Sequence, residues 1–455
     1  MYFIDEVSVV SHHELEASVF SVLDQLIRPG HLLVGFSGGL DSRVLLELLA
    51  RYISQRDGFS LQAVHVHHGL NPKADQWLTH CAQVCDALAV PFIAKRVEIE
   101  KKARQSLEDL ARQARYDVFR QNLPEGGVLL TAHHQDDQLE TLLLALKRGS
   151  GPRGLSAMPA KTAFAGGHLV RPLLTFSRQQ LSDWAISQQL SWIEDDSNQD
   201  ERFDRNFLRQ KVIPLLRQRW PEITATASRS AGLCAEQETL LDDIAQQDLT
   251  ASQHPDGSLD ISLLDNLSLA RRHQLLRFWL RQQTGTVPSQ VQLQKIWPEV
   301  ALARQDATPE LVWQQGIIRR YQHRLYQVNA DATTSITLPI LRLQMDTPLA
   351  LPGGILTLRS DHSTHAQLRM PALNEPLSVV FNLPGAVKVH PVGRQHSREL
   401  KKLWQEYGVA PWLRSTVPVI CYQDKVAAAV GVFICQEYCC PEDRNGLRID
   451  WQPNS

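Results

Sequence analysis

The stretch Gly35-Phe36-Ser37-Gly38-Gly39-Leu40-Asp41-Ser42, GFSGGLDS, joins a short apolar run, HLLVGF, to a segment with a helical pattern, RVLLELLARY. A glycine-rich turn between a strand and a helix lets backbone N–H groups approach an anion closely, and the helix adds its positive N-terminal end. The hydroxyls of Ser37 and Ser42 add hydrogen-bonding groups to the same turn. The stretch therefore predicts a phosphate-binding loop formed by residues 37–42.

The charge of this loop is unusual for a phosphate site. The common nucleotide-triphosphate loop carries Lys after its last Gly, whereas no Gly-Lys dipeptide occurs in this chain. A carboxylate at Asp41 repels phosphate unless a divalent cation lies between them. We therefore predict that Asp41 holds Mg²⁺ on the triphosphate while the loop binds the phosphates that leave. That arrangement suits cleavage between the α- and β-phosphates with transfer of AMP, and the alternative is a plain glycine turn.

The composition is that of a soluble globular chain. It has 455 residues, 43% of them hydrophobic and 21% charged, with a net charge of -2. That length corresponds to two to four domains. Seven cysteines are too few, and odd in number, for a disulfide framework. Because the N-terminus has no basic signal region and no run of about 18 apolar residues occurs, we expect a cytoplasmic protein with no membrane partner.

Residues 30–150 alternate regularly between strand-like and helix-like segments. Strands are predicted at 31–36, 61–68, 91–99 and 127–134. Helices are predicted from Ser42, at 75–90, at 106–121 and at 136–147. This alternation predicts an α/β domain with a doubly wound parallel sheet. Ligands bind such sheets at the carboxyl ends of the strands, which is where SGGLDS, HHGL and HHQDDQLE lie.

Three domains are expected along the chain. Residues 1–222 form the ATP-binding catalytic domain, and its glycine-rich segment 149–155 is expected to move or to contact ligand. Residues 223–330 are mainly helical and glutamine-rich. Residues 335–455 contain short strand-like runs punctuated by Pro and Gly, which are typical of a small α+β domain.

An acidic pair follows the fourth predicted strand. Asp137 and Glu140 are three residues apart at the start of a helix, so they share one of its faces. Two carboxylates at a strand's carboxyl end can bind an ammonium group or help to hold Mg²⁺. The alternative is the ordinary enrichment of acids at a helix start. The adjacent His133 and His134 favour the functional interpretation.

Two groups of basic residues in the first 222 residues are candidates for phosphate contacts. Arg112 and Arg115 share a helical face with Glu108, where an arginine can stabilise charge on the α-phosphate or the adenylated base. The spacing does not separate Arg112 from Arg115, and a salt-bridged helix surface is the alternative. The segment 201–219 carries Arg205, Arg209 and other cations interleaved with aromatic residues, which predicts a patch that tracks nucleic-acid phosphates.

A third basic cluster lies near the C-terminus. It comprises Lys388, Arg394, Arg398, Lys401, Lys402 and Arg414. A helix over 398–407 would align Arg394, Arg398 and Lys402 at i, i+4 spacing. Like charges in that arrangement destabilise a helix, so a polyanionic partner would explain them.

The motif SGGxDS resembles the pyrophosphatase-loop ATP enzymes, which include GMP synthetase, asparagine synthetase and tRNA-modifying enzymes. Further motifs are similar to those of the tRNA(Ile)-lysidine synthetase family. They are His68-Gly69-Leu70, Leu107-Glu108-x-x-Ala111-Arg112-x-x-Arg115-Tyr116, Ala132-His133-His134-Gln135-Asp136-Asp137-Gln138-x-Glu140-Thr141, Arg171-Pro172-Leu173, Asp195-Asp196-Ser197-Asn198, Arg205-Asn206-x-x-Arg209, Gly393-Arg394-x-x-x-Arg398-x-Leu400-Lys401-Lys402-Leu403 and Pro411-Trp412-Leu413-Arg414. The resemblance spans the chain and is weakest in its middle third.

The resemblance implies a role for each matched residue. ATP is bound by Ser37, Gly38, Gly39, Leu40, Asp41 and Ser42, with Mg²⁺ on Asp41. The catalytic residues are Asp41, Arg115, Asp137, Glu140 and Arg205, and lysine is bound by Asp137, Glu140 and His133. The tRNA is bound by Arg205, Arg209, Arg394, Arg398, Lys401 and Lys402, with the last domain on the acceptor stem.

The implied reaction joins L-lysine to C2 of the wobble cytidine in a tRNA(Ile) with a CAU anticodon. It proceeds through adenylated tRNA and releases diphosphate and AMP. One alternative is a tRNA thiolase, which needs reactive cysteines, whereas Cys81 and Cys85 are expected in a helix far from the strand ends. An amide-forming NAD or GMP synthetase and a non-catalytic tRNA-binding protein are further alternatives. The sequence leaves open whether the chain forms a homodimer.

Overall fold

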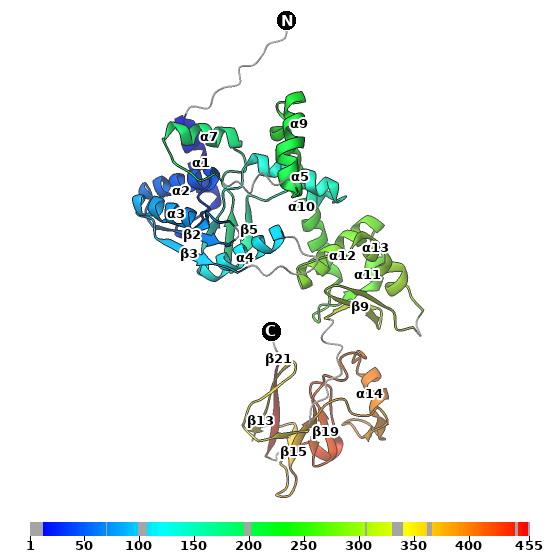
Figure 1. Ribbon diagram of the computed structural model, residues 1–455. Helices are drawn as coiled ribbons and strands as arrows, with labels where there is room; N and C mark the ends of the chain where they lie inside the picture. The colour runs from blue at the N-terminus through cyan, green and yellow to red at the C-terminus, as the bar shows by residue number, and fades with distance from the viewer. Residues whose placement is uncertain are drawn as a thin grey trace. The chain divides into compact units, whose positions relative to one another are not determined.

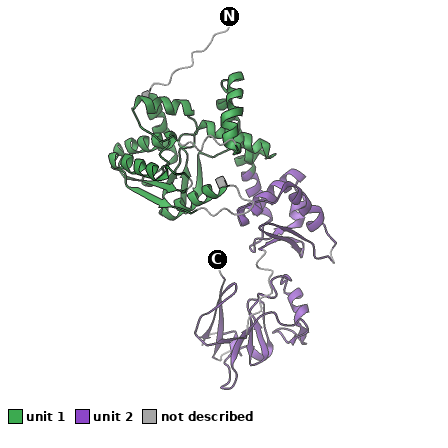
Figure 2. Ribbon diagram, in the orientation of Figure 1, with its two compact units in different colours: residues 1–241 green, residues 242–455 purple. Residues whose placement is uncertain are grey.

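The structure is a computed structural model that describes residues 12–69, 71–98, 107–194, 202–304, 307–329, 340–361, 366–441 and 445–453. Of the predicted motifs, Leu70, the side chains of Leu107 and Glu108, and residues 195–198 lie outside the described part. The chain divides into two compact units, residues 1–241 and residues 242–455 (Figure 2).

A mostly parallel sheet forms the centre of the first unit. Its six strands lie in the order β3-β2-β1-β4-β6-β5. Their bounds are β1 Gly30–Gly35, β2 Phe59–His67, β3 Phe92–Arg96, β4 Val128–Leu130, β5 Lys161–Phe164 and β6 Gly167–Val170. All neighbours pair in parallel except β5 and β6, which form an antiparallel edge hairpin that the sequence analysis did not predict. The four predicted strands and their parallel pairing are confirmed.

Helices cover both faces of this sheet, as Figure 1 shows. The helices in this part of the unit are α1 His12–Leu26, α2 Leu40–Ser54, α3 Ala74–Ala87, α4 Leu107–Asn122, α5 Gln135–Lys147, α6 Pro152–Leu155 and α7 Arg178–Ser187. Successive strand residues point to opposite faces. Leu32 and Val34 of β1 accordingly pack with α1, α2 and α7, whereas Leu33 packs with the residues of α4. The predicted doubly wound α/β architecture is confirmed.

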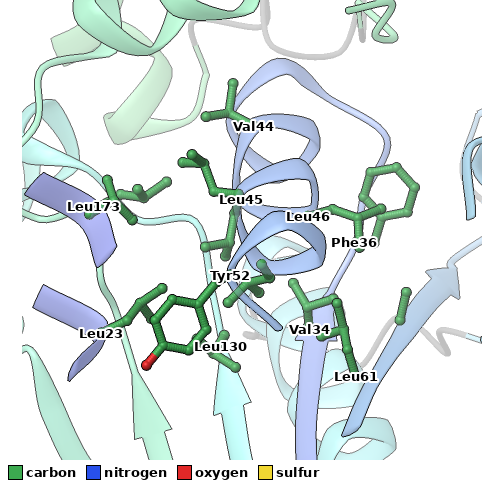
Figure 3. Close-up of a cluster of buried hydrophobic side chains, with 14 of the residues drawn as sticks. Leu23, Val34, Phe36, Val44, Leu45, Leu46, Tyr52, Leu61, Leu130 and Leu173 are labelled. Atoms are coloured by element: carbon green, nitrogen blue, oxygen red, sulfur yellow. The ribbon is translucent and has the colours of Figure 1, made fainter. Parts of the chain in front are cut away.

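The core beneath α2 fixes the position of the loop that precedes this helix. Figure 3 shows Val34, Leu61 and Leu130 of the sheet beside the helix residues Leu45 and Tyr52. All five side chains are almost fully buried. Burying a side chain of this size stabilises the fold by about 1.5–3 kcal/mol. This packing holds the end of β1 and the start of α2 rigidly, and the glycine-rich loop lies between them.

A basic segment packs on α5 in the first unit. It consists of α8 Asp204–Phe207, the π-helical segment η2 Leu208–Val212 and α9 Ile213–Arg219, followed by the long helix α10 Ile223–Ser252. Ile213 of α9, Ala227 of α10 and Leu139 of α5 form a small hydrophobic cluster that attaches this segment to α5. The predicted glycine-rich loop at 149–155 contains the short helix α6.

The first part of the second unit is mainly helical, as expected, with a small sheet added. Its helices are α11 Ile261–Asp265, α12 Leu269–Thr284 and α13 Gln290–Lys295, continued by the π-helical segment η3 Ile296–Ala301. The antiparallel sheet has the order β7-β10-β9-β8, with bounds β7 Leu259–Asp260, β8 Glu310–Trp313, β9 Gly316–Tyr321 and β10 Arg324–Val328. These hairpins were not predicted, because the β9–β10 turn uses Gln322 and His323 with φ of 43° and 61°, where Asn-Gly or Asp-Gly is the usual signal.

The last part of the second unit is an α+β structure built on three small sheets. Their orders are β11-β15-β18-β19-β20, β12-β13-β21-β14 and β16-β17. The strands are β11 Leu341–Leu343, β12 Leu349–Leu351, β13 Gly354–Asp361, β14 Leu368–Arg369, β15 Leu377–Val380, β16 Lys388–Val389, β17 Arg398–Glu399, β18 Val419–Tyr422, β19 Lys425–Ala429, β20 Phe433–Ile434 and β21 Gly446–Pro453. The helix α14 Leu400–Glu406 and the 3₁₀ turn η5 Gln436–Tyr438 complete it. None of the described helices has the length and apolar character that crossing a bilayer requires.

Candidate active site at the glycine-rich loop

The loop between β1 and α2 is held by its own hydroxyl groups. Ser42 Oγ lies 3.0 Å from Ser37 Oγ, and it donates a hydrogen bond of 3.0 Å to the Gly39 carbonyl. It also accepts a bond of 3.3 Å from the Ser37 N–H. Gly39 is the N-cap of α2 and makes no side-chain cap hydrogen bond. The first N–H groups of α2 therefore remain available to an anion, as the sequence predicted.

Gly38 is required by both its backbone conformation and its surroundings. Its φ is +88°, and a Cβ at this position would lie 2.6 Å from Ile193 Cδ1 and 2.8 Å from Cys81 Sγ. The Gly38 carbonyl also accepts a hydrogen bond of 2.9 Å from the Ile193 N–H. The loop is thus wedged between α3 and the segment after α7, with no room for a side chain.

We expect Gly38→Ala to destabilise the protein by about 1–3 kcal/mol, because it combines left-handed backbone strain with overpacking. ATP binding should weaken in parallel. Chemical denaturation and ATP titration measure the two effects. The matched control is Gly126→Ala, where φ is +74° but nothing lies within 4 Å of the added Cβ. An equal loss of stability in both variants would contradict the close packing proposed for Gly38.

Asp41 lies in the first turn of α2 and faces the β4–α5 turn. Its Oδ2 is 3.6 Å from His134 Nε2, and its Oδ1 is 3.9 Å from Arg178 Nε. Buried Oδ1 accepts no hydrogen bond from the described residues. Mg²⁺ is typically bound through one or two carboxylates together with substrate phosphates and water. Since Oδ1 has no hydrogen-bond donor among the described residues, this carboxylate fits a cation shared with phosphates.

His134 connects Asp41 to the start of α5. Only 2% of the residue is exposed, and its Nε2 lies 3.4 Å from Asp137 Oδ2 as well as near Asp41. Burial alone would lower the pKa of His134, but the carboxylates of Asp41, Asp137 and Asp136 outweigh it and raise the pKa. Burial raises the pKa of Asp137, yet His134, His133 and a hydrogen bond from the His134 N–H lower it overall. The cluster therefore favours an imidazolium at His134 beside an ionised Asp137.

The acidic pair is brought together and is covered by one arginine. Arg209 Nε donates to Glu140 Oε1 at 2.7 Å, and its Nη2 donates to Glu140 Oε2 at 3.0 Å and to Asp137 Oδ1 at 3.3 Å. Burial raises the pKa of Glu140 even though Arg209 opposes this effect. Arg205 Nη2 donates to Thr141 Oγ1 at 3.1 Å and its Nε lies 3.9 Å from Glu140 Oε2. The predicted acidic face and the predicted basic segment thus form one ion-pair network.

The backbone that carries Arg209 is unusual. Arg209 belongs to the π-helical segment η2, and Arg217 of α9 pairs with Asp136 at the start of α5. π-helical turns are rare and are frequent at functional sites. No residue pattern signals such a turn, so sequence analysis could not detect it.

His133 lies beside the acidic pair in its neutral form. Its Nδ1 is 2.9 Å from Thr131 Oγ1. Burial, helped by the cations Arg171, Arg112 and Arg205 and opposed by the charge of Asp137, lowers the pKa of His133 to about 3. A neutral imidazole can donate or accept a hydrogen bond but does not repel an ammonium group.

Arg112 and Arg115 affect different histidines. The Arg112 guanidinium lies 4.9 Å from the ring centre of Tyr116. Its charge lowers the pKa of His133, which follows β4. Arg115 instead affects His68, the residue after β2. Burial is the larger cause and the charge of Arg115 the next, and together they lower the pKa of His68 to about 4. The charge of Arg112 is thus felt by the histidine after β4, and the charge of Arg115 by the histidine after β2.

The two cysteines of α3 correct one expectation. Cys81 was expected to lie far from the strand ends, but its Sγ is 3.6 Å from His65 Nδ1 and lies close to Gly38. The expectation failed because the loop folds back onto α3. Burial raises the pKa of Cys81 to about 12 and that of Cys85 to about 11. Since the thiolate is the reactive form, these buried thiols are unsuited to sulfur transfer.

The helix predicted over 398–407 is present as α14, which begins at Leu400, but it does not align the three C-terminal cations. Arg398 lies in β17 and Arg394 in the preceding turn, while Lys401 and Lys402 lie in α14. Arg394 pairs with Glu406 at 2.7 Å, and Lys402 lies 4.0 Å from Glu399. Because β16 pairs with β17, the chain is extended at Arg398 and Glu399, the first two residues of the predicted helix. These residues form a mixed-charge surface in the second unit, and Lys401 lines a cavity of about 390 Å³ that also includes Arg319, Trp412 and Arg414.

Three family models match this chain. A PP-loop domain matches residues 12–216, a TilS substrate binding domain matches 259–326 and a TilS substrate C-terminal domain matches 377–451. Curated relatives match almost end to end. A tRNA(Ile)-lysidine synthase of Shigella flexneri is 47% identical over 94% of this chain and 98% of the relative. The proteins of that name from Escherichia coli O157:H7 and Serratia proteamaculans are 47% and 48% identical, covering 98% and 95% of those relatives.

Solved structures resemble separate parts of the chain. A TilS C-terminal domain covers 26% of this chain and 98% of its own, with a TM-score of 0.23 and 18% identity. A U34-tRNA thiolase from Methanococcus maripaludis covers 49% of this chain and 79% of its own, with a TM-score of 0.41 and 16% identity.

Proposed function

This chain belongs to the tRNA(Ile)-lysidine synthase family, and we propose that it joins L-lysine to C2 of the wobble cytidine of a tRNA(Ile) with a CAU anticodon, through an adenylated tRNA. Membership makes it an ATP-using PP-loop ligase that forms a carbon–nitrogen bond. One observation carries the finer proposal. His134 lies between the phosphate loop and the acidic pair, 3.6 Å from Asp41 and 3.4 Å from Asp137. This geometry supports an ATP site that adjoins the proposed ammonium site.

In the proposed first step the C2 oxygen of cytidine attacks the α-phosphorus of ATP. The bond from that phosphorus to the bridging oxygen breaks, and diphosphate leaves. The free N–H groups at the start of α2 and the hydroxyls of Ser37 and Ser42 stabilise the charge that develops on the departing phosphates. Mg²⁺ held by Asp41 would neutralise charge on these phosphates. Arg112 and Arg115, whose charges are felt by the histidines after β4 and β2, are available to the transferred AMP group.

In the proposed second step the ε-amine of lysine attacks C2, and the C2–O bond breaks to release AMP. The attacking amine must be neutral, so a neighbouring group must accept a proton. Glu140 suits this role better than Asp137, because the pKa of Glu140 is raised by its burial whereas that of Asp137 is lowered overall. Asp137 remains the charged partner for the lysine ammonium.

The proposed reaction can be tested directly. The enzyme is incubated with ATP, labelled lysine and either tRNA(Ile) with a CAU anticodon or tRNA(Met). We expect label in tRNA(Ile) alone, and tRNA-dependent diphosphate release when lysine is omitted. An absence of label in tRNA(Ile) would overturn the function, and label in both RNAs would overturn only the discrimination between them.

We propose that the three matched regions act as functional domains. Residues 1–222 carry the chemistry, while 223–330 and 335–455 bind tRNA, and the matched family models support this division. All seven cysteines are free, which supports a reducing location such as the cytoplasm.

Changing Lys401 and Lys402 to Ala tests the C-terminal tRNA contacts. Both side chains are exposed, so we expect little change in stability but weaker tRNA binding. The slope of log affinity against log salt should fall by about 1 for each lost phosphate contact. Filter binding over a salt series measures both. Lys425→Ala is the control, since this exposed lysine of β19 lies 3.7 Å from Glu437. An unaltered slope in the double variant would remove Lys401 and Lys402 from the tRNA contacts.

A further inference from the structure

The proposed lysine site already contains a cation that belongs to the protein. The Arg209 guanidinium uses two nitrogens on the two oxygens of Glu140, at 2.7 and 3.0 Å, and one of them also reaches Asp137 at 3.3 Å. A two-pronged arginine–carboxylate contact of this kind is among the stronger polar contacts in proteins. Arg209 therefore neutralises the acidic charge on which an incoming ammonium group would depend.

Lysine bound at this proposed site would compete with Arg209 for the same carboxylates. The Glu140 side chain is 1% exposed, so few solvent molecules can screen two cations placed beside it. An ammonium group arriving while Arg209 is in place meets a like charge at close range. Lysine binding in this arrangement is therefore weakened by the protein's own arginine.

Arg209 also has access to a second class of partner. Its side chain is 39% exposed, whereas that of Glu140 is 1% exposed, so solvent reaches part of the arginine side chain but not the carboxylate. Lys211 and Arg219, on the same basic segment, are exposed. A line of exposed cations attracts a nucleic-acid backbone, and guanidinium groups bind phosphate oxygens with the same fork that they use for carboxylates. The Arg209 guanidinium can thus leave Glu140 and bind an RNA phosphate instead.

We propose that Arg209 is an internal competitor of substrate lysine, which occupies Asp137 and Glu140 until a tRNA phosphate draws it away. The inference rests on the proposed function and adds a positioning role to a residue that the sequence assigned only to tRNA contact. tRNA then raises the affinity for lysine, and lysine raises the affinity for tRNA by the same factor, because coupling between two binding sites is reciprocal. The consequence is an order of events in which lysine enters fully only after tRNA has docked.

The coupling is measured on the wild-type enzyme without ATP, so that no chemistry occurs. Equilibrium dialysis with labelled L-lysine, with and without saturating tRNA(Ile) at mildly alkaline pH, gives the two affinities. We expect about a tenfold tighter binding of lysine in the presence of tRNA, within the usual range of such couplings. Filter binding of tRNA with and without lysine should give the same factor. Equal lysine affinities with and without tRNA overturn the proposal.

The Arg209→Gln variant separates the effect of displacing Arg209 from any other effect of tRNA on lysine affinity. This variant should bind lysine about tenfold more tightly than wild type in the absence of RNA, with little further gain from tRNA. Arg209→Lys, which keeps a cation but loses the fork, should restore part of the coupling. Arg219→Gln removes an exposed cation from the same segment without touching the acidic pair and should leave RNA-free lysine affinity unchanged.

Two outcomes of the variant experiment overturn the inference: unchanged or weaker RNA-free lysine binding by a folded Arg209→Gln protein, or full coupling retained in it. Thermal unfolding confirms that the variant is folded, and the wild-type coupling measurement stands without it. The labelled-lysine incorporation assay reports separately on the proposed function. A wild-type enzyme that modifies tRNA(Ile) but shows no coupling would refute the role of Arg209 alone.

Discussion

Asp41→Asn is expected to lower tRNA-dependent diphosphate release from ATP by about a thousandfold or more, while tRNA binding stays nearly intact. Removing one charge-stabilising group from a preorganised site costs about 10²–10³ in rate, and the loss of a metal adds to that. The expectation rests on the position of Asp41 at the first turn of α2, where its Oδ1 lies buried without a hydrogen-bond partner among the described residues. An amide at this position is neutral and is a poorer ligand for Mg²⁺.

The measurement is diphosphate release in single turnover, run beside tRNA filter binding. Asp117→Asn is the matched control, since this aspartate lies in α4 and pairs with exposed Arg120. It should leave both quantities close to wild type. Normal turnover in Asp41→Asn would remove the metal role from this residue, and a parallel loss of tRNA binding would indicate a structural defect.

Glu140→Gln is expected to raise the lysine concentration needed for half-maximal rate by about a hundredfold, equivalent to about 3 kcal/mol, with little change in the ATP requirement. The carboxylate is 1% exposed and accepts both prongs of Arg209. The neutral amide loses the attraction for the ammonium group and cannot accept its proton. Lysine and ATP titrations of the same tRNA-modification reaction separate the two requirements.

Glu47→Gln provides a control for the general cost of altering a buried, ion-paired glutamate. Glu47 of α2 is 9% exposed and pairs with Arg43 at 2.9 Å and Arg51 at 3.1 Å. Its variant should lose stability without a selective change in the lysine requirement. If Glu140→Gln raised the ATP requirement more than the lysine requirement, Glu140 would belong with the metal and phosphates.

Features that depend on neighbouring positions were predictable from the sequence. The strand–loop–helix order around Gly38 requires only an apolar run, glycines and a helical pattern, and the loop lies between β1 and α2 as expected. The shared face of Asp137 and Glu140 follows from their spacing on a helix, and Arg209 contacts both. The helix over 398–407 failed at its start because Arg398 pairs with Val389 in a strand, a contact that helical spacing cannot reveal.

Contacts between distant segments required the tertiary structure. The sequence places Cys81 in a helix, but only the packing of α3 against the loop brings its sulfur close to Gly38. Likewise the sequence supplies an acidic face and a basic segment as separate features, and 69 positions separate Glu140 from Arg209.

The sequence by itself therefore determined the α/β architecture, the phosphate loop and the acidic pair, because helix and strand periodicity act over a few residues. The tertiary structure alone decided that Arg209 covers the acidic pair and that His134 bridges it to Asp41. Ion pairing between segments depends on how their hydrophobic faces pack, here Leu139 of α5 against Ile213 of α9. That packing sets the two charged surfaces at contact distance, and no local spacing encodes it.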